Sequence, residues 1–475
     1  MIDRQELMEF ARELSLDPKV VEKDYILGWL LAGIANHPDL SEQWVFKGGT
    51  CLKKCYFETY RFSEDLDFTI SEQTHFDQNF LLGTFSEISA WIYDQTGIEI
   101  PADQVRFDVG ENKRGGTTVE GRVYYVGPLQ QRRNLMRIKL DLTNYEILVL
   151  EPARREVHHP YSDKPESGIF AQCYCFEEVF AEKVRALAER ERPRDLYDVV
   201  HLYRHDEIRS DRALVMSTLQ EKCNFKGIPV PTRETLLTQT AREKLLAEWE
   251  DMLAHQLPAL PSFDQFWTEL PMVLDWLHQI MEKPVLQSQP TDSRYHIDQN
   301  WQPPAMIQMW DEHAPIESIR FAAANRLCIN LQYQGSWRLI EPYSLRMTSE
   351  GNILLCAVRR DNGEARSYRL DRVQSVEVSK DDFIPKYLIE LTSSGPLSIP
   401  VAHEKMSTLF KPIRSSSSAR KRISASGFGP KYTFECSACG KKFTRKSYDA
   451  ALNPHKNKQG YPCYGRIGFH VKTEY

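Results

Sequence analysis

A diglycine step between a short apolar run and a helical pattern is the feature that most constrains this fold. Gly48 and Gly49 close the apolar run, and the helical pattern begins directly after them. Paired glycines interrupt regular structure, so we expect a strand, a tight turn and the start of a helix. Residues 65–70 then alternate polar and apolar side chains, which predicts a half-buried strand. Because alternate strand residues share a face, Asp65 and Asp67 should point to the same side.

This arrangement suits the chemistry of nucleotidyl transfer. Backbone N–H groups at a diglycine turn can approach phosphates closely, and a following helix N-terminus adds a favourable dipole. Two adjacent carboxylates can share Mg²⁺ (or Mn²⁺), a hard cation that a nucleoside triphosphate also binds. The simpler alternative is a surface turn and an edge strand with two solvated carboxylates. The pattern predicts two metal ligands, Asp65 and Asp67, and a nucleotide-binding set comprising Lys47, Gly48, Gly49, Thr50 and Ser63.

The surrounding patterns predict an α+β domain with a helical rear half. Apolar periodicity indicates helices over 3–36 and 79–96, and strands over 105–109, 117–126 and 135–142. The spacing is helical from Phe176 to about residue 283. We therefore expect one domain over 1–283, with an α+β core to about residue 175 and helices beyond it.

Several motifs in this domain resemble those of a known family. They are Lys23-Asp24-Tyr25, Phe46-Lys47-Gly48-Gly49-Thr50, Arg61-Phe62-Ser63-Glu64-Asp65-Leu66-Asp67, Ile138-Lys139-Leu140-Asp141, Glu182-Lys183-Val184-Arg185-Ala186-Leu187 with Arg190, and Arg194-Asp195-Leu196-Tyr197-Asp198. On these motifs the chain resembles the AbiEii/AbiGii toxin family of nucleotidyltransferases, within the DNA polymerase β-like superfamily. The resemblance extends to about residue 280. It implies that Asp141 is a third carboxylate beside Asp65 and Asp67.

The helical motifs add cations and carboxylates to the candidate site. Lys183 and Arg190 share one helix face, where a cation can neutralise charge that builds on the leaving pyrophosphate. The alternative for Lys183 is a solvated helix position. Asp195 and Asp198 are three apart and can face the same way. The resemblance makes both candidates for catalysis, with one facing the site and the other capping or pairing locally.

The resemblance also implies a biological role. It implies a toxin of a toxin–antitoxin or abortive-infection (antiphage defence) system, with a cognate antitoxin as a partner. Such a toxin transfers a nucleoside monophosphate from an NTP to RNA, with the tRNA 3′ end the leading acceptor, and so blocks translation. Two alternatives stay open: an inactive nucleic-acid-binding regulator built on the same fold, and an enzyme that nucleotidylates a protein or small molecule.

A second domain follows a polar segment. Residues 284–304 are rich in Gln, Pro, Ser and Asp, which predicts a linker. Five strand-like runs between residues 327 and 378 then predict a small β-barrel domain over 305–412. This part resembles a WYL domain, a Sm/SH3-like barrel found in bacterial defence and regulatory proteins, through Tyr333, Arg338, Glu341-Pro342-Tyr343 and Arg369-Leu370-Asp371-Arg372. The tripeptide that names the domain is here Ile353-Leu354-Leu355, so its aromatic residues are absent.

Three arginines of this barrel are candidates for an anion-binding face. Arg338, Arg369 and Arg372 could bind nucleic acid or a nucleotide. The alternative is that some of them pair with Glu341 and Asp371 as structural salt bridges.

A basic, serine-rich linker over 413–430 leads to a small module over 431–475. Cys436 and Cys439 have the spacing of two zinc ligands around a tight turn. We predict structural Zn²⁺ bound by Cys436, Cys439, His455 and Cys463, with His470 in reserve. From Lys411 onward, fourteen Lys and Arg stand against three acidic residues, which indicates an anionic partner such as RNA, or else a solvated tail.

Composition places the chain among ordinary globular proteins. Its 475 residues include 41% hydrophobic and 27% charged residues, enough for about three domains with their own cores. No apolar run approaches the roughly 18 residues of a membrane span, and the first residues lack the pattern of a signal peptide. We therefore expect a cytoplasmic protein without a membrane partner, in which the ten cysteines are buried thiols or metal ligands.

Overall fold

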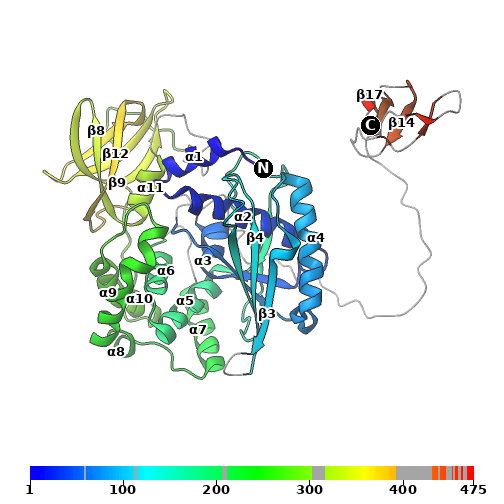
Figure 1. Cartoon of the computed structure of the whole chain (residues 1–475). Coiled ribbons are helices and arrows are strands. Elements are labelled where there is room, and N and C mark those ends of the chain that lie inside the picture. Colours follow the sequence, from blue (N-terminus) through cyan, green and yellow to red (C-terminus); the bar gives the residue numbers. More distant parts are fainter. Residues whose placement is uncertain are drawn as a thin grey trace. The chain divides into compact units, whose positions relative to one another are not determined.

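The computed structural model describes two compact units, residues 1–402 and 403–475 (Figure 1). The residues it describes are 1–57, 60–111, 115–205, 211–301, 316–391, 431–436, 439–445, 452, 455–457, 462–463 and 468–474. The predicted linker 413–430 and both ends of the predicted domain 305–412 lie outside these residues. Within the described residues, no helix is both long and apolar enough to cross a lipid bilayer.

A seven-stranded mixed sheet forms the centre of the first unit. Its order is β3-β4-β5-β2-β1-β7-β6. The strands are β1 (Trp44–Lys47), β2 (Asp65–Ile70), β3 (Val105–Glu111), β4 (Thr117–Tyr125), β5 (Met136–Thr143), β6 (Ala153–Glu156) and β7 (Phe170–Cys173). Two neighbouring pairs, β2 with β5 and β1 with β7, are parallel, and the others are antiparallel. The predicted strands are confirmed, and β6 and β7 are additions.

The sheet has one apolar face and one polar face at its centre. Along β5, Ile138, Leu140 and Leu142 are buried, whereas the alternate residues are partly exposed. The helices α2 (Pro18–Asn36) and α4 (Gln78–Thr96) pack against this sheet, with α2 contacting β5 and β7 and α4 contacting β3. Because alternate strand residues face opposite sides, the polar residues of β2 and β5 lie on one common face.

Helices account for the rest of the first domain. The helical segment begins at the diglycine itself as α3 (Gly48–Cys51) and continues as a π-helical turn (Leu52–Tyr56). The other helices are α1 (Arg4–Glu13), α5 (Phe176–Arg190), α6 (Pro193–Arg204), α7 (Arg212–Lys226), α8 (Arg233–Leu236), α9 (Gln239–Leu253) and α10 (Phe263–Leu277). The helical rear half predicted after residue 176 is therefore confirmed (green in Figure 1).

A five-stranded antiparallel sheet follows helix α11 (Ile316–Ala324). Its order is β11-β10-β9-β8-β12, and its strands are β8 (Leu327–Tyr333), β9 (Ser336–Met347), β10 (Ile353–Arg359), β11 (Ala365–Arg369) and β12 (Val373–Asp382). All five match the predicted strands.

The preceding segment, predicted as a linker, packs on this sheet over its described part, 284–301. The Gln289 amide is buried and donates to the Ala357 carbonyl at 3.1 Å. Ile297 pairs with Thr348, and the Asp298 N–H donates to the Met347 carbonyl at 2.9 Å. The polar composition of this segment predicted a flexible linker. Its polar groups instead form hydrogen bonds with the second sheet. This part therefore belongs structurally to the second domain.

The second unit contains short strands around a Cys/His cluster. β13 (Lys431–Cys436) pairs with β14 (Lys442–Arg445) and β17 (Gly468–Glu474), and β15 (His455–Lys456) pairs with β16 (Pro462–Cys463). Among the described residues of this unit, the buried cluster comprises Cys436, Leu452 and Cys463. Two of these three residues are cysteines, which can also act as metal ligands.

Candidate active site

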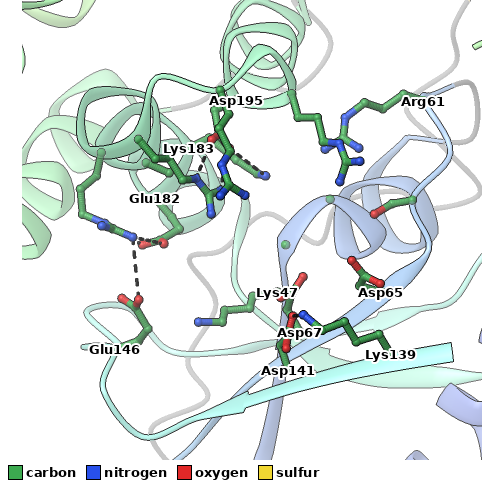
Figure 2. A pocket seen from close by; sticks show the side chains of 18 residues that line it. Lys47, Arg61, Asp65, Asp67, Lys139, Asp141, Glu146, Glu182, Lys183 and Asp195 are labelled. Atoms are coloured by element: carbon green, nitrogen blue, oxygen red, sulfur yellow. Dashed lines mark hydrogen bonds and ion pairs between the residues drawn. The ribbon is translucent and has the colours of Figure 1, made fainter. Parts of the chain in front are cut away.

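A polar cavity lies between the polar face of the first sheet and helices α5 and α6. It encloses about 300 Å³ and is lined by Lys47, Gly48, Gly49, Arg61, Ser63, Asp65, Asp67, Lys139, Asp141, Glu146, Glu182, Lys183, Arg185, Ala186, Arg190, Arg192, Arg194 and Asp195. Figure 2 shows Asp65, Asp67 and Asp141 on the sheet side and Lys183 and Asp195 on the helical side. Most residues of the predicted site therefore converge, although they come from distant parts of the chain.

Strand register brings the carboxylates together. Asp67 lies opposite Asp141 on the parallel neighbour β5, and opposite Lys47 on the antiparallel neighbour β1. Asp65 is two residues before Asp67 on β2 and faces the same side. The Lys139 amine pairs with Asp141 at 2.9 Å. The position expected for Asp141, beside the other two carboxylates, is thus observed.

The diglycine lies directly against this carboxylate group. Gly48 has φ +83°, and a Cβ there would lie 2.2 Å from Oδ2 of Asp67. A Cβ at Gly49 would lie 2.5 Å from Nη2 of Arg61 and 3.2 Å from Oγ of Ser63. Both positions therefore need glycine, the first for its backbone conformation as well as for space. The backbone of both glycines lines the cavity, next to the Asp67 carboxylate and the Arg61 guanidinium.

Thr50 differs from its predicted role. Its side chain is buried, and its hydroxyl donates to the Asp65 carbonyl oxygen at 2.5 Å. It does not line the cavity. The reason is that the helix turns back over β2 at once, so Thr50 fastens the helix to the strand instead of facing a phosphate.

Burial and mutual repulsion shift the carboxylates toward their protonated forms. Burial, with Asp141 and Asp65 nearby, raises the pKa of Asp67 to about 6 despite the opposing charge of Lys47. Burial likewise raises the pKa of Asp65. Carboxylates crowded in this way gain from a bound cation, and an all-oxygen donor set suits Mg²⁺ or Mn²⁺. Burial lowers the pKa of Lys47, which faces the same group.

The helical wall is held by a buried ion-pair network centred on Asp198. Arg61 donates two hydrogen bonds to this carboxylate, at 2.7 and 2.8 Å, and the Lys183 amine lies 2.7 Å from it. Burial opposes ionisation, but Arg61 and Lys183 hold the pKa of Asp198 well below its usual range. Asp198 does not line the cavity, so its place is behind the site. Lys183 is buried, which excludes the solvated alternative.

Asp195 is the member of the pair that faces the cavity. Its carboxylate accepts two hydrogen bonds from Arg190, at 2.7 and 2.9 Å, and lies 3.6 Å from the Lys183 amine. The expected division, with one aspartate at the site and one pairing locally, is therefore observed.

Sequence reasoning gave no role to several cavity residues. Arg192 and Arg194 flank Pro193 in the connection between α5 and α6, and within the described part of the chain neither has a carboxylate at ion-pairing distance. The Arg-Glu-Arg-Pro-Arg run ending at Arg194 was a usable signal. Glu146, which approaches Arg185 at 3.8 Å, carried no such signal because it lies in an irregular loop.

The predicted anion face of the second sheet is less open than expected. Arg369 donates to Asp371 at 3.0 and 2.7 Å, as the structural alternative proposed. Arg338 donates to the carbonyls of Tyr333 and Ser336. Arg372 is exposed. Two of the three arginines are therefore already engaged within the domain.

The four predicted zinc ligands form one cluster in the second unit. The ligand atoms of Cys436, Cys439, His455 and Cys463 lie within 4.8 Å of one another. His470 instead contacts the Thr473 hydroxyl at 2.9 Å on β17, so the reserve ligand is not needed. A second group, Cys51, Cys55 and Cys173, is packed with similar proximity in the core of the first unit.

Comparison with known proteins identifies the family. The sequence profile described as "Nucleotidyl transferase AbiEii toxin, Type IV TA system" matches residues 29–269, half of the chain. The chain belongs to the AbiEii family of nucleotidyltransferase toxins. The WYL domain profile matches residues 316–378, so this AbiEii member carries a WYL domain. A search of curated proteins found no match.

Two solved structures are similar to this AbiEii protein over part of its length. JHP933 from Helicobacter pylori is 18% identical, with 56% of this chain and 94% of that chain covered and a TM-score of 0.36. MenT4, a nucleotidyltransferase toxin from Mycobacterium tuberculosis, is 17% identical, with 58% and 90% covered and a TM-score of 0.39.

Proposed function

We propose that this chain transfers a nucleoside monophosphate from an NTP to RNA, with the tRNA 3′ end as acceptor, and releases pyrophosphate. The observation that carries the proposal is the contact between the diglycine and the carboxylates: Gly48 lies against Asp67, which lies beside Asp141. A nucleotide bound at the diglycine would have its phosphates within reach of these carboxylates. In a bacterial cell this activity would block translation, as part of a toxin–antitoxin or antiphage defence system with a cognate antitoxin.

We assign roles to the residues according to where they lie. The backbone of Gly48 and Gly49, with Ser63 and Lys47, binds the triphosphate. Asp65, Asp67 and Asp141 hold Mg²⁺ or Mn²⁺, which neutralises phosphate charge when it is bound. Lys183 and Arg190 face the leaving pyrophosphate, and Asp195 orients both through its ion pairs. Asp198 acts behind the site by holding Arg61 and Lys183.

Charge supports a nucleic-acid acceptor. The cavity is lined by eight Lys and Arg side chains against six carboxylates, and the C-terminal 65 residues are strongly basic. Cationic surfaces attract the phosphate backbone irrespective of sequence. We therefore propose that Arg192 and Arg194, at the cavity wall, contact acceptor phosphates.

We further propose a division of labour among the parts. Residues 1–283 form the catalytic domain, and the WYL domain over 305–412 also takes in the preceding segment 284–301, which packs on it. Residues 413–430 form a basic linker, and 431–475 form a zinc-binding module that binds RNA. Arg338, Arg369 and Arg372 of the WYL domain would contribute a weaker anion surface, because Arg369 already pairs with Asp371.

The test uses each labelled NTP with Mg²⁺ and purified tRNA or total RNA. We expect label in RNA with the full chain, none with Asp67→Asn, and undiminished label with Asp108→Asn. Asp108 is a matched control because it is an exposed aspartate on β3 of the same sheet, outside the cavity. Label in protein or a small molecule instead of RNA would contradict the acceptor. DNA binding without any transfer would contradict the activity.

Zinc can be tested by metal analysis of the purified full chain. We expect about one zinc per chain, which the Cys436→Ser/Cys439→Ser double variant loses because thiolates supply the tightest ligands. Cys175→Ser, at a half-buried cysteine outside both clusters, should keep the zinc. Zinc that persists in the double variant would overturn the assignment.

A further inference from the structure

Helix α6 touches both the active site and the WYL domain. It carries Asp195 and Asp198, which hold the cationic groups of the cavity. The same helix carries Tyr197, whose hydroxyl reaches Asn325 directly after α11, and Arg204, whose guanidinium donates to the carbonyl of Ala324, the last residue of α11. Helix α6 therefore contacts both the cavity and the WYL domain.

The first contact is a buried hydrogen bond between the domains. The Tyr197 hydroxyl donates to the side-chain carbonyl of Asn325 at 2.9 Å, and both residues are fully buried. The Asn325 amide in turn donates to the Phe321 carbonyl at 3.0 Å, which fixes it at the end of α11. The Tyr197 ring stacks between Phe266 of α10 and His201 of α6. The hydroxyl therefore has one well-defined position.

A short chain of packed groups connects this contact to the cavity. The Tyr197 ring lies 5.8 Å from the Tyr60 ring, centroid to centroid. The Tyr60 hydroxyl donates to Asp198 at 2.5 Å. Asp198 accepts from Arg61 and Lys183, which line the cavity. Every residue in this series of contacts is buried and closely packed, so a shift of one side chain requires its neighbours to move as well.

A second contact locks the end of α6 onto the WYL domain. Glu269 of α10 pairs with Arg204 at 2.7 Å and with Arg326 at 2.7 Å. Arg326 follows Asn325 and adopts φ +55°, a left-handed conformation that is costly for a non-glycine residue. The carbonyls of both residues accept hydrogen bonds from Gln265 of α10. Such a turn persists only where its surroundings hold it in place.

We propose that Asn325, from the WYL domain, is a positioning residue of the transferase site. Through Tyr197 it fixes α6, and α6 fixes Asp195, Asp198 and the cations that they hold. The WYL domain is then part of the catalytic assembly, and a change at the end of α11 alters the rate of transfer. This inference rests on the proposed transferase activity.

The test measures kcat and KM for the NTP in full-length variants. Tyr197→Phe removes only the hydroxyl, and Asn325→Ala removes its acceptor. We expect each to lower kcat roughly tenfold, because small misplacements of catalytic groups are costly. KM for the NTP should stay within about twofold, since the diglycine and the carboxylates lie on the sheet. The double variant should be no slower than either single variant, because both remove the same interaction.

Tyr343→Phe is the matched control. Tyr343 is equally buried and donates to Glu341 at 2.9 Å, but it lies within the WYL domain and away from α6. It should lower the melting temperature by a similar amount and leave kcat unchanged. Unchanged kcat in Tyr197→Phe, or multiplicative losses in the double variant, would overturn the inference. If the wild-type chain transfers no nucleotide, the proposed function itself fails. If the wild-type chain is active but Tyr197→Phe is equally active, only the inference about Asn325 fails.

Discussion

The transferase cavity and the WYL sheet both carry several arginines, but they use them differently. In the cavity, Arg192 and Arg194 have no carboxylate partner within the described residues, and Arg194 makes one long hydrogen bond, to the Met252 carbonyl at 3.5 Å. On the sheet, Arg369 pairs with Asp371 two residues away, and Arg338 donates to backbone carbonyls. The comparison shows that residue type alone does not identify an anion site. Charged side chains indicate a ligand site when several of them line one cavity and some of them lack a carboxylate partner.

The same contrast holds for carboxylates. Asp67 and Asp141 lie side by side, and burial together with the nearby carboxylates raises the pKa of Asp67. Asp141 shares its partner Lys139 with this crowded group, whereas Asp371 pairs with the guanidinium of Arg369 on an exposed surface. Bringing like charges together costs free energy. A bound cation offsets this cost, so adjacent carboxylates are favoured at a metal-binding site. The following predictions test whether the cavity and the sheet differ in function as they do in charge arrangement.

The largest effect is expected from Asp198→Asn. This substitution leaves the guanidinium of Arg61 buried without its ion-pair partner, and it leaves the Lys183 amine with only the Asp195 carboxylate, at 3.6 Å. Breaking a buried ion pair from one side costs about 3–5 kcal/mol, so the free energy of unfolding should fall by that amount. Urea denaturation measures it. Asp264→Asn removes an exposed partner of Arg242 and should have little effect; equal losses in both variants would contradict the account.

Gly48→Ala should lower the transfer rate by about 100-fold, because the new Cβ would collide with the Asp67 carboxylate. Gly97→Ala is its control, since Gly97 also has positive φ (+79°) but no atom within 4 Å of an added Cβ. That control should lose about 1 kcal/mol of stability and keep full activity. Similar activities of the two variants would show that only backbone strain matters at Gly48.

The smallest effects compare arginines directly. Arg194→Ala in the cavity should reduce transfer roughly tenfold through lost contact with acceptor phosphates, seen as a higher KM for RNA. Arg369→Ala on the WYL sheet should leave transfer unchanged, because its charge is already paired. Steady-state kinetics with tRNA measures both. A larger loss for Arg369→Ala than for Arg194→Ala would reverse the comparison.

Much of the catalytic sheet could be predicted because its signals are local. Alternation along residues 65–70 gave β2 and the common face of Asp65 and Asp67, and the family motif added Asp141. The ion pair between Arg61 and Asp198 spans 137 residues, and no local pattern encodes such a distance. The Thr50 hydroxyl bonds to the Asp65 carbonyl and not to a ligand because α3 packs closely on β2, a tertiary contact that no local sequence pattern encodes.

Other features escaped because their sequences resemble something else. β6 is Ala153–Glu156, four residues without apolar alternation, and it is held as a strand by pairing with β7. The segment 284–301 has the composition of a linker, yet buries Gln289 against the second sheet. Both cases show tertiary contacts overriding local composition.

A crystal structure with Mn²⁺ and a non-hydrolysable NTP tests the central claim most directly, because manganese can be located by its anomalous signal. The account predicts manganese bound by the carboxylates of Asp65 and Asp67, with the triphosphate against the backbone of Gly48 and Gly49. Manganese bound elsewhere, or a triphosphate seated away from the diglycine, would contradict it.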